Sequence, residues 1–395
     1  MIVSAIPRST LVFSGTTSEY FKIWIFNVCL TLVTLGIYSP WAKVRRLRYF
    51  HGNTALGEHG FAYAADPVRI LKGRIIAVTA LLLYVATTYF APHVALGILS
   101  FGILLTPAII VVAARFNLRN TTYRNVRFDL RARIMDAYRM FIIPLFVLVA
   151  GAWSLYFLTE NSHFVEQIQA AGGDEFHREE LFTTYLFVLL GPLLPYLDYL
   201  RVRFLANHIF WGNLPFRFEG GASRFYEIYI VAGVIAFALL LVTVFGGGAL
   251  FVLLSGVMRA VNAAEPPATG PDPQDMLLLA LMGGMVGYGC LIFSAGYLRA
   301  RRSNLILSAT HIEGRLLRSD LGAWKMGWLY AGNTIAILFS AGLLIPWAMI
   351  RTARYVAART GADVDSSLLT LNTGDGPTTA MGEEMVDAFD MDIGL

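Results

Sequence analysis

Residues 34–54 read TLGIYSPWAKVRRLRYFHGNT, and this segment joins an apolar stretch to a cluster of basic and turn-forming residues. Gly36 and Pro40 interrupt the apolar pattern, because glycine and proline both disfavour the interior of a helix. Gly342 and Pro346 interrupt a related segment near the other end of the chain in the same way. We therefore identify these four residues as candidate helix breaks.

Two conformations of the first apolar segment are compatible with its sequence. Its start, residues 13–15, matches residues 218–220, which precede an outward-directed helix, whereas its end matches helices that leave the membrane inward. A helix that breaks and returns to the same face explains both matches. However, Lys43, Arg45 and Arg46 then lie deep in the returning half, which favours an ordinary spanning helix. The last apolar segment leaves the same two alternatives open.

The composition excludes a water-soluble globular protein. Of the 395 residues, 56% are hydrophobic and 15% are charged, whereas soluble domains carry about 25% charged residues. A bilayer-spanning helix needs roughly 20 mostly apolar residues. Such stretches lie at about 19–38, 74–91, 94–114, 138–158, 181–200, 226–257, 276–297 and 327–347. We predict an all-α polytopic membrane protein: a helix bundle with six clear transmembrane helices, plus first and last segments that either span or re-enter.

The positive charges indicate how the helices are oriented. Lysine and arginine concentrate in the segments 39–74, 115–139, 201–224 and 299–325, whereas the intervening loops are poor in them. Cytoplasmic loops of membrane proteins carry this excess of positive charge. We therefore expect the four basic segments to lie in the cytoplasm.

An internal repeat accompanies these basic segments. An arginine at the end of an inward-directed helix recurs as Arg48, Arg115, Arg203, Arg299 and Arg354, and an asparagine suited to a turn recurs as Asn53, Asn120, Asn207 and Asn304. Aromatic residues then alternate with other residues, as at 61–63, 126–128 and 216–218, which is typical of strands. We expect short β-arms on the cytoplasmic face and three regions: an N-terminal arm (1–18), a repeated transmembrane domain (19–360) and an acidic, disordered tail (361–395).

The chain resembles a known family through residues 19–21 (EYF), 32–50 (LVTLGIYSPWAKVRRLRYF) and 52–54 (GNT). These strings are similar to those of the YjgN family, a family of bacterial inner-membrane proteins classed as a domain of unknown function. The resemblance covers residues 13 to about 360. It implies a multi-pass protein of the bacterial inner membrane, and it implies no reaction, cofactor or active-site residue.

The sequence contains no catalytic or metal-binding signature. Nucleophile-elbow, phosphate-loop and zinc-protease motifs are absent, and Cys29 and Cys290 are too few for a disulfide framework or a four-cysteine metal site. The histidines of the arms invite a metal hypothesis, but their spacing favours ordinary surface residues; they are His51, His59, His208 and His311. We therefore expect no enzyme activity, no cofactor and no metal.

Three polar residues within apolar segments are candidate functional residues. Asp198 is a candidate for a proton or cation path, although pairing with Arg201, three residues later, is the favoured interpretation. Asn27 and Asn333 occupy equivalent places in the repeat. We expect them to hydrogen-bond across a contact between helices, or alternatively to line a solute-binding cavity.

The arginines give the strongest indication of a ligand. The chain has only four lysines among its 31 basic residues, and arginine, unlike lysine, can donate two parallel hydrogen bonds to a phosphate. The five recurring arginines are therefore candidate contacts to anionic lipid headgroups, although a general compositional bias toward arginine is an equal alternative. Nucleic acid is not an expected partner, because the net charge is only +4. The acidic tail is a candidate protein-binding segment.

Two functions remain as hypotheses. The first is a transporter or channel for a small solute or lipid, since broken helices in corresponding repeats often flank a substrate path. The alternative is a non-transporting protein that binds anionic lipid or acts as a membrane scaffold, with a basic cytoplasmic platform. A continuous polar cavity between the helices favours the first, and an arginine-lined groove at the inner face favours the second.

Overall fold

The chain folds around a closed antiparallel β-barrel. The computed structural model describes residues 9–160, 178–261, 273–312 and 315–362. The ten strands of the barrel are β1 (Ser9–Phe13), β2 (Thr54–Leu56), β3 (His59–Tyr63), β4 (Thr121–Tyr123), β5 (Val126–Leu130), β6 (Ile209–Trp211), β7 (Leu214–Phe218), β8 (Thr310–Ile312), β9 (Arg315–Ser319) and β10 (Thr360–Ala362). Each strand pairs with its neighbours in sequence, and β1 pairs with β10 to close the ring.

The barrel is built from four hairpins and one pair formed by the two ends of the described chain. In each hairpin a strand of three residues is followed by a strand of five, and β10 with β1 repeats these lengths. Two-residue turns connect β4 to β5 and β6 to β7. Their residues Arg124, Asn125 and Gly212 have positive φ angles, as tight hairpin turns require. Because the ring is closed, no strand edge is left unpaired.

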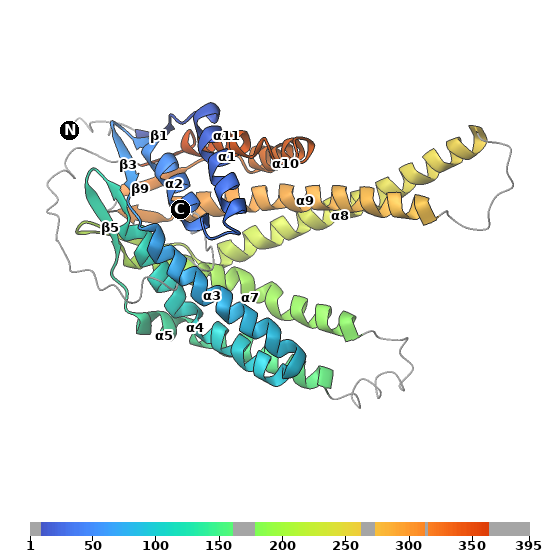
Figure 1. The fold of residues 1–395 in the computed structure, drawn as a ribbon, viewed down its shortest axis with the longest axis horizontal. Coiled ribbons are helices and arrows are strands. Elements are labelled where there is room, and N and C mark those ends of the chain that lie inside the picture. The colour runs from blue at the N-terminus through green and yellow to red at the C-terminus, as the bar shows by residue number, and fades with distance from the viewer. Residues whose placement is uncertain (1–8, 161–177, 262–272, 313–314, 363–395) are drawn as a thin grey trace.

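Helices lead into and out of each strand pair. They are α1 (Thr17–Val33), α2 (Ser39–Gly52), α3 (Pro67–Phe90), α4 (Pro92–Arg119), α5 (Ile134–Glu160), α7 (Arg178–His208), α8 (Ala222–Val261), α9 (Pro273–Ser308), α10 (Ala323–Phe339) and α11 (Ile345–Ala357). The strands lie at one end of the molecule, and the long helices extend away from that end (Figure 1). Consecutive helices pack together, and α11 also packs on α1.

The first and last apolar segments are helical hairpins that leave the barrel and return to it. The break between α1 and α2 contains Leu35 and Gly36 at φ +50° and +92°, and Ala341 and Gly342 repeat these angles at +48° and +90° between α10 and α11. Pro40 and Pro346 lie in the first turns of α2 and α11, where a proline does not disturb a helix. Each hairpin therefore has both ends at the same face of the molecule.

Aromatic side chains fill the lumen of the barrel. Tyr123 and Trp211 are each 4% exposed, and their ring centroids are 5.5 Å apart. Phe61 stacks on Tyr123 at 4.8 Å, and Phe128 lies between Trp211 and Phe216. The Tyr123 hydroxyl donates to the Leu56 carbonyl at 2.9 Å, and the Trp211 indole N–H donates to the Tyr123 carbonyl at 3.4 Å, so both polar groups of these rings are satisfied. A cavity of about 160 Å³ remains among these rings.

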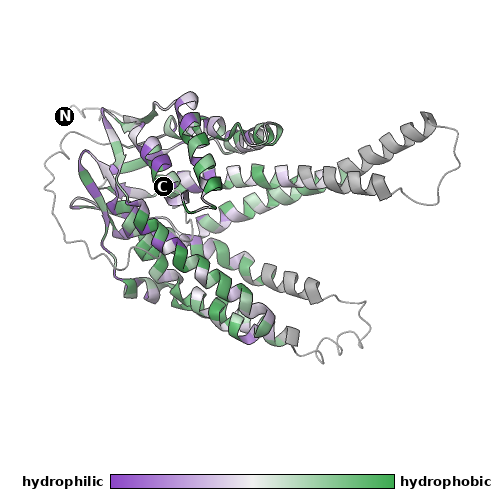
Figure 2. Ribbon diagram, viewed as in Figure 1, coloured by the Kyte–Doolittle hydropathy of each residue, from purple (hydrophilic) through white to green (hydrophobic). Residues whose placement is uncertain are grey.

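The predicted all-α bundle with six clear transmembrane helices is wrong. The strands form a closed barrel rather than a few short arms, because β1, within the predicted N-terminal arm, pairs with β10 at residues 360–362. In the described part of the chain, four helices are long and apolar enough to cross a membrane: Pro67–Phe90, Pro92–Arg119, Ile134–Phe157 and Ala222–Thr243. Apolar residues dominate these helices, whereas polar residues concentrate at the barrel end (Figure 2). The remainder of the predicted tail lies outside the described residues.

Candidate functional site

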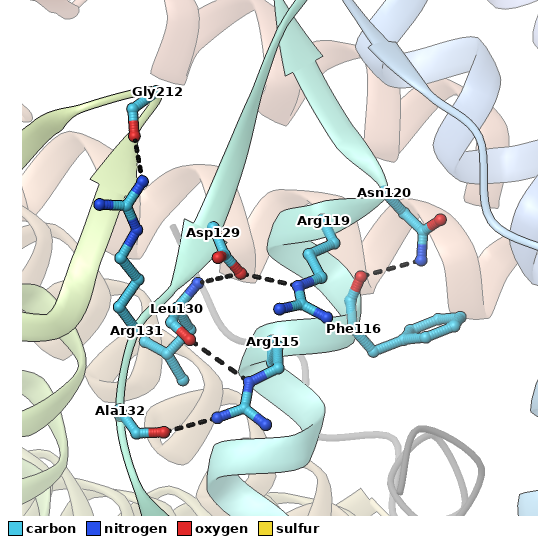
Figure 3. A network of polar contacts seen from close by, with 9 residues as sticks. All are labelled: Arg115, Phe116, Arg119, Asn120, Asp129, Leu130, Arg131, Ala132 and Gly212. Atoms are coloured by element: carbon cyan, nitrogen blue, oxygen red, sulfur yellow. Dashed lines mark hydrogen bonds and ion pairs between the residues drawn. The ribbon is translucent and has the colours of Figure 1, made fainter. Parts of the chain in front are cut away.

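Three of the recurring arginines bind backbone carbonyls where strands lead into helices. Arg48 donates to the Ala65 carbonyl at 3.3 Å, and Arg354 donates to the Gly15 carbonyl at 2.8 Å. Arg115 donates to the carbonyls of Leu130 and Ala132, at 3.3 and 2.5 Å (Figure 3). Ala65, Ala132 and Gly15 each follow the end of a five-residue strand by two residues. These guanidinium groups therefore hold the turn from strand to helix, a structural role that the sequence alone did not indicate.

The surroundings of Arg115 show how closely this junction is connected. Arg119 pairs with Asp129 at 2.7 Å, and the same carboxylate accepts a hydrogen bond from the Leu130 amide at 2.8 Å (Figure 3). Arg131 donates to the Gly212 carbonyl at 3.0 Å and so links β5 to the turn of the next hairpin. The arginines of this junction are thus engaged with the protein itself.

The asparagines of the predicted repeat lie near the same end of the helices, but they have different roles. Asn53 and Asn120 cap α2 and α4, and each side-chain amide donates at 2.8 Å to the carbonyl four residues earlier. Asn207 accepts from the Phe218 amide at 2.7 Å. Asn304 lies six residues before β8, as Arg48 does before β2, and it donates to the Leu321 carbonyl at 2.9 Å. The structure therefore aligns Asn304, and not Arg299, with Arg48.

The two remaining arginines make tyrosine contacts. Arg203 donates to the Tyr199 hydroxyl at 2.9 Å, and Arg299 donates to the Tyr330 hydroxyl at 2.7 Å. Both bonds are exposed at the surface. Among the described contacts, neither arginine donates a hydrogen bond to the backbone of a strand-to-helix turn.

We expect Arg115→Gln to lower the stability of the protein without lowering its affinity for lipid. The glutamine cannot reach both carbonyls, so two charge-assisted hydrogen bonds are lost, and we expect a cost of about 1.5–3 kcal/mol. Arg115→Lys keeps the positive charge but loses the bidentate geometry of the guanidinium group. We therefore expect its stability to lie between that of Arg115→Gln and that of the parent. Thermal unfolding in detergent measures this order. A stability equal to that of the parent in both variants would contradict the structural role.

Asp198 forms an ion pair, but not with the predicted partner. Both oxygens of its carboxylate accept from Arg302, at 2.6 and 2.8 Å, and the Tyr229 hydroxyl donates to it at 3.2 Å. The two side chains of the pair are 10% and 20% exposed. This bidentate pair ties α7 to α9, whereas Arg201, the residue expected from helical spacing, makes no direct hydrogen bond to Asp198 that the structure describes.

Asn27 and Asn333 are both 7% exposed, but they differ in their hydrogen bonds. The Asn333 amide donates to the Ala348 carbonyl at 3.3 Å and to the Thr352 hydroxyl at 3.0 Å, and its oxygen accepts from Arg351 at 3.1 Å. The Oδ1 atom of Asn27 is buried, and none of the described residues donates a hydrogen bond to it. The sequence predicted equivalent roles. In the structure, however, the amide oxygen of Asn333 accepts a hydrogen bond, whereas that of Asn27 accepts none from the described residues.

Asn27 lies in a groove of about 380 Å³ between α1, α2, α3 and α11, which we call the cationic groove. Its basic residues are Lys43, Arg46 and Arg74, and the Arg74 guanidinium donates to the Ser39 hydroxyl. The residues that line it are Tyr20, Trp24, Asn27, Val28, Thr31, Leu32, Ser39, Ala42, Lys43, Arg46, Arg74, Ile345 and Met349, and none of them is a carboxylate. Three cations beside apolar side chains suit a ligand with an anionic head and an apolar body.

Two of the four arm histidines, His51 and His208, have structural contacts. His51 hydrogen-bonds to the Leu47 carbonyl at 2.9 Å and lies against the ring of Tyr63, and His208 bonds to the Phe204 carbonyl at 2.7 Å. Burial lowers the pKa of His51, which favours its neutral form. Among the described residues, no three histidine, cysteine or acidic side chains are grouped so that they could hold a metal ion.

The apolar helices and the cationic groove define the class: this is a membrane protein with its β-barrel at one end of the helices. The chain belongs to the DUF898 family, bacterial proteins of unknown function, whose family model matches residues 8–388. It is 25% identical to the inner membrane protein YjgN of Salmonella typhimurium strain LT2 over 93% of this chain and 92% of that protein. It is also 43% identical to YjgN of Escherichia coli K12 over 58 residues, 15% of each chain. The predicted family resemblance is confirmed, and no solved structure matches.

Proposed function

We propose that this protein binds an anionic phospholipid in the cationic groove and serves as a non-enzymatic lipid-binding or scaffold protein of the bacterial inner membrane. The observation that carries the proposal is the convergence of Lys43, Arg46 and Arg74 from two helices on one groove. A phosphate placed among them gains charge-assisted hydrogen bonds. Basic pockets between helices at the cytoplasmic side are typical sites of anionic headgroups.

The helical hairpins support insertion of this groove into one leaflet. Helix α1 has 17 residues, a length of about 25 Å, which is less than the hydrocarbon thickness of about 30 Å. Apolar side chains are exposed at the tips: Leu35 is 94% exposed and Phe339 is 89% exposed. Such residues are stable in lipid rather than in water. We infer that both hairpins enter the bilayer from the barrel side and end within it.

The same proposal gives the protein an orientation. All four basic segments of the sequence lead into or out of strands of the barrel, so the positive-inside rule assigns the barrel to the cytoplasm. The longer apolar helices then cross the inner membrane several times. We also infer that the five strand pairs with their helices descend from one repeated unit, since strand lengths and the Arg48, Arg115 and Arg354 contacts recur among them.

Transport has less support than lipid binding. A path along the barrel axis would pass the buried rings of Tyr123 and Trp211. The acid proposed for a cation path, Asp198, has both oxygens bound to Arg302. The cationic groove, by contrast, lies between helices beside the barrel, where lipid is available to its basic residues.

The double variant Arg46→Gln with Arg74→Gln tests the proposal. Each basic residue near a charged headgroup contributes about 1 kcal/mol, so we expect the affinity for dioleoylphosphatidylglycerol to fall roughly thirtyfold. Detergent-purified protein is titrated with this lipid, and bound lipid is counted by native mass spectrometry. Dioleoylphosphatidylcholine serves as the uncharged comparison and is expected to bind weakly to both proteins.

A second double variant controls for the loss of charge. Arg139→Gln with Arg359→Gln also removes two positive charges, at side chains that are 78% and 42% exposed and lie outside the groove. We expect its affinity for the anionic lipid to match that of the parent. Equal losses in the two double variants would refute a specific site and leave only general attraction to the basic face.

A further inference from the structure

The unpaired oxygen of Asn27 distinguishes the cationic groove from the matching site in the second hairpin. Asn333 lies at the same place in α10, and its oxygen accepts a hydrogen bond from Arg351. The residue that corresponds to Arg351 is Arg45, and its guanidinium lies over the ring of Phe26, 5.1 Å from the centroid. The residue that corresponds to Thr352 is Arg46, which lines the groove. In the part of the chain that the structure describes, Asn333 thus has a donor for its oxygen and Asn27 has none.

A buried acceptor without a donor is unfavourable, and a ligand that brings a donor removes that penalty. Asn27 lines the groove together with Lys43, Arg46 and Arg74, so a phosphate held by the cations brings its neighbouring headgroup atoms close to the amide. The donor cannot favourably be an ammonium group, because the same three cations repel it. A hydroxyl group carries no charge and meets the requirement.

We propose, building on the lipid-binding function above, that the groove selects a phosphodiester headgroup that carries a hydroxyl, as the glycerol headgroup of phosphatidylglycerol does. Lys43, Arg46 and Arg74 bind the phosphate, and Asn27 accepts a hydrogen bond from the headgroup hydroxyl. Trp24, the apolar residues of α1 and Ile345 of α11 contact the acyl chains. Asn27 is therefore the residue that determines headgroup specificity.

Two anionic lipids, one with a hydroxyl-bearing headgroup and one without, test this assignment. Dioleoylphosphatidylglycerol and dioleoylphosphatidylmethanol carry the same charge, phosphodiester and acyl chains, but the methyl headgroup has no donor. We expect the parent protein to bind the glycerol lipid about tenfold more tightly in native mass spectrometry titrations, as the loss of one hydrogen bond to a buried group predicts. In Asn27→Leu we expect this preference to vanish, with the methyl lipid bound about as well as by the parent.

Further variants separate the specificity claim from the lipid-binding claim. Arg46→Gln should weaken both lipids equally and keep their ratio, because it acts on the phosphate. Asn27→Ser, a smaller change, substitutes if Asn27→Leu does not fold, and it is also expected to reduce the preference. Equal binding of both lipids by the parent, or an unchanged preference in both Asn27 variants, overturns the hydroxyl assignment and leaves the groove a phosphate site. Failure of the parent to bind either lipid instead overturns the proposed function.

Discussion

Replacing Trp211 by alanine is expected to lower the stability of the protein by about 3–5 kcal/mol, because it removes the largest side chain from the barrel lumen. Trp211 is 4% exposed, and its ring lies between those of Tyr123 and Phe128. The truncation also enlarges a cavity of about 160 Å³ that already lies beside it. Thermal unfolding in detergent, followed by far-ultraviolet circular dichroism, measures the effect.

Trp328→Ala is the matched control for this experiment. The Trp328 side chain is 69% exposed and lies on α10, outside the barrel. We expect a change of less than about 1 kcal/mol, as is usual for exposed positions. Similar losses in the two variants would mean that the barrel lumen does not form the stabilising core described above.

Asp198→Asn is expected to cost about 3–5 kcal/mol, because it leaves the partly buried guanidinium of Arg302 without its anionic partner. Burial, and then the nearby charge of Arg302, lower the pKa of Arg201, whereas Asp198 raises it, so both cations lose a compensating charge. The expected result is a large fall in the thermal midpoint and in the yield of folded protein.

A double-mutant cycle distinguishes the ion pair from a general packing effect. Arg302→Met alone leaves the Asp198 carboxylate unpaired and should also destabilise strongly. The double variant Asp198→Asn with Arg302→Met removes both charges and is expected to be more stable than the sum of the single losses predicts. Simple additivity would show that the two residues do not act as a pair.

The short strands could be predicted from local sequence, but the closure of the barrel could not. The aromatic alternation at 61–63, 126–128 and 216–218 correctly marked parts of β3, β5 and β7. The pair of β1 and β10 joins residues about 350 positions apart, so no local pattern reports it. One signal was present: Phe13 and Phe218 each end a strand and lie against the glycine two residues later, where a Cβ atom would overlap the ring. The match of residues 13–15 to 218–220 was interpreted as the start of a helix, although it also marked the end of a strand.

The candidate site shows the same limit. Arg48, Arg115 and Arg354 are candidates because arginine suits phosphate, but the sequence does not reveal that they bind backbone carbonyls of strand-to-helix turns, one of which, at Gly15, lies 339 residues from its arginine. From the sequence, Lys43 and Arg46 argue against a broken first helix, because their charges would lie deep in the returning half. In the structure the hairpin places them beside Arg74 of α3 in one groove. Residues that argue against a hairpin in the sequence thus form the best candidate site once the hairpin packs against α3.

The lipid that remains bound after purification tests the central claim most directly. Protein extracted from bacterial membranes in mild detergent is analysed by native mass spectrometry, together with the Arg46→Gln, Arg74→Gln double variant purified in parallel. The proposal predicts one tightly bound anionic phospholipid on the parent protein and its loss from the variant. A parent protein free of anionic lipid, or a variant that retains it to the same extent, would contradict the assignment of the cationic groove as a lipid site.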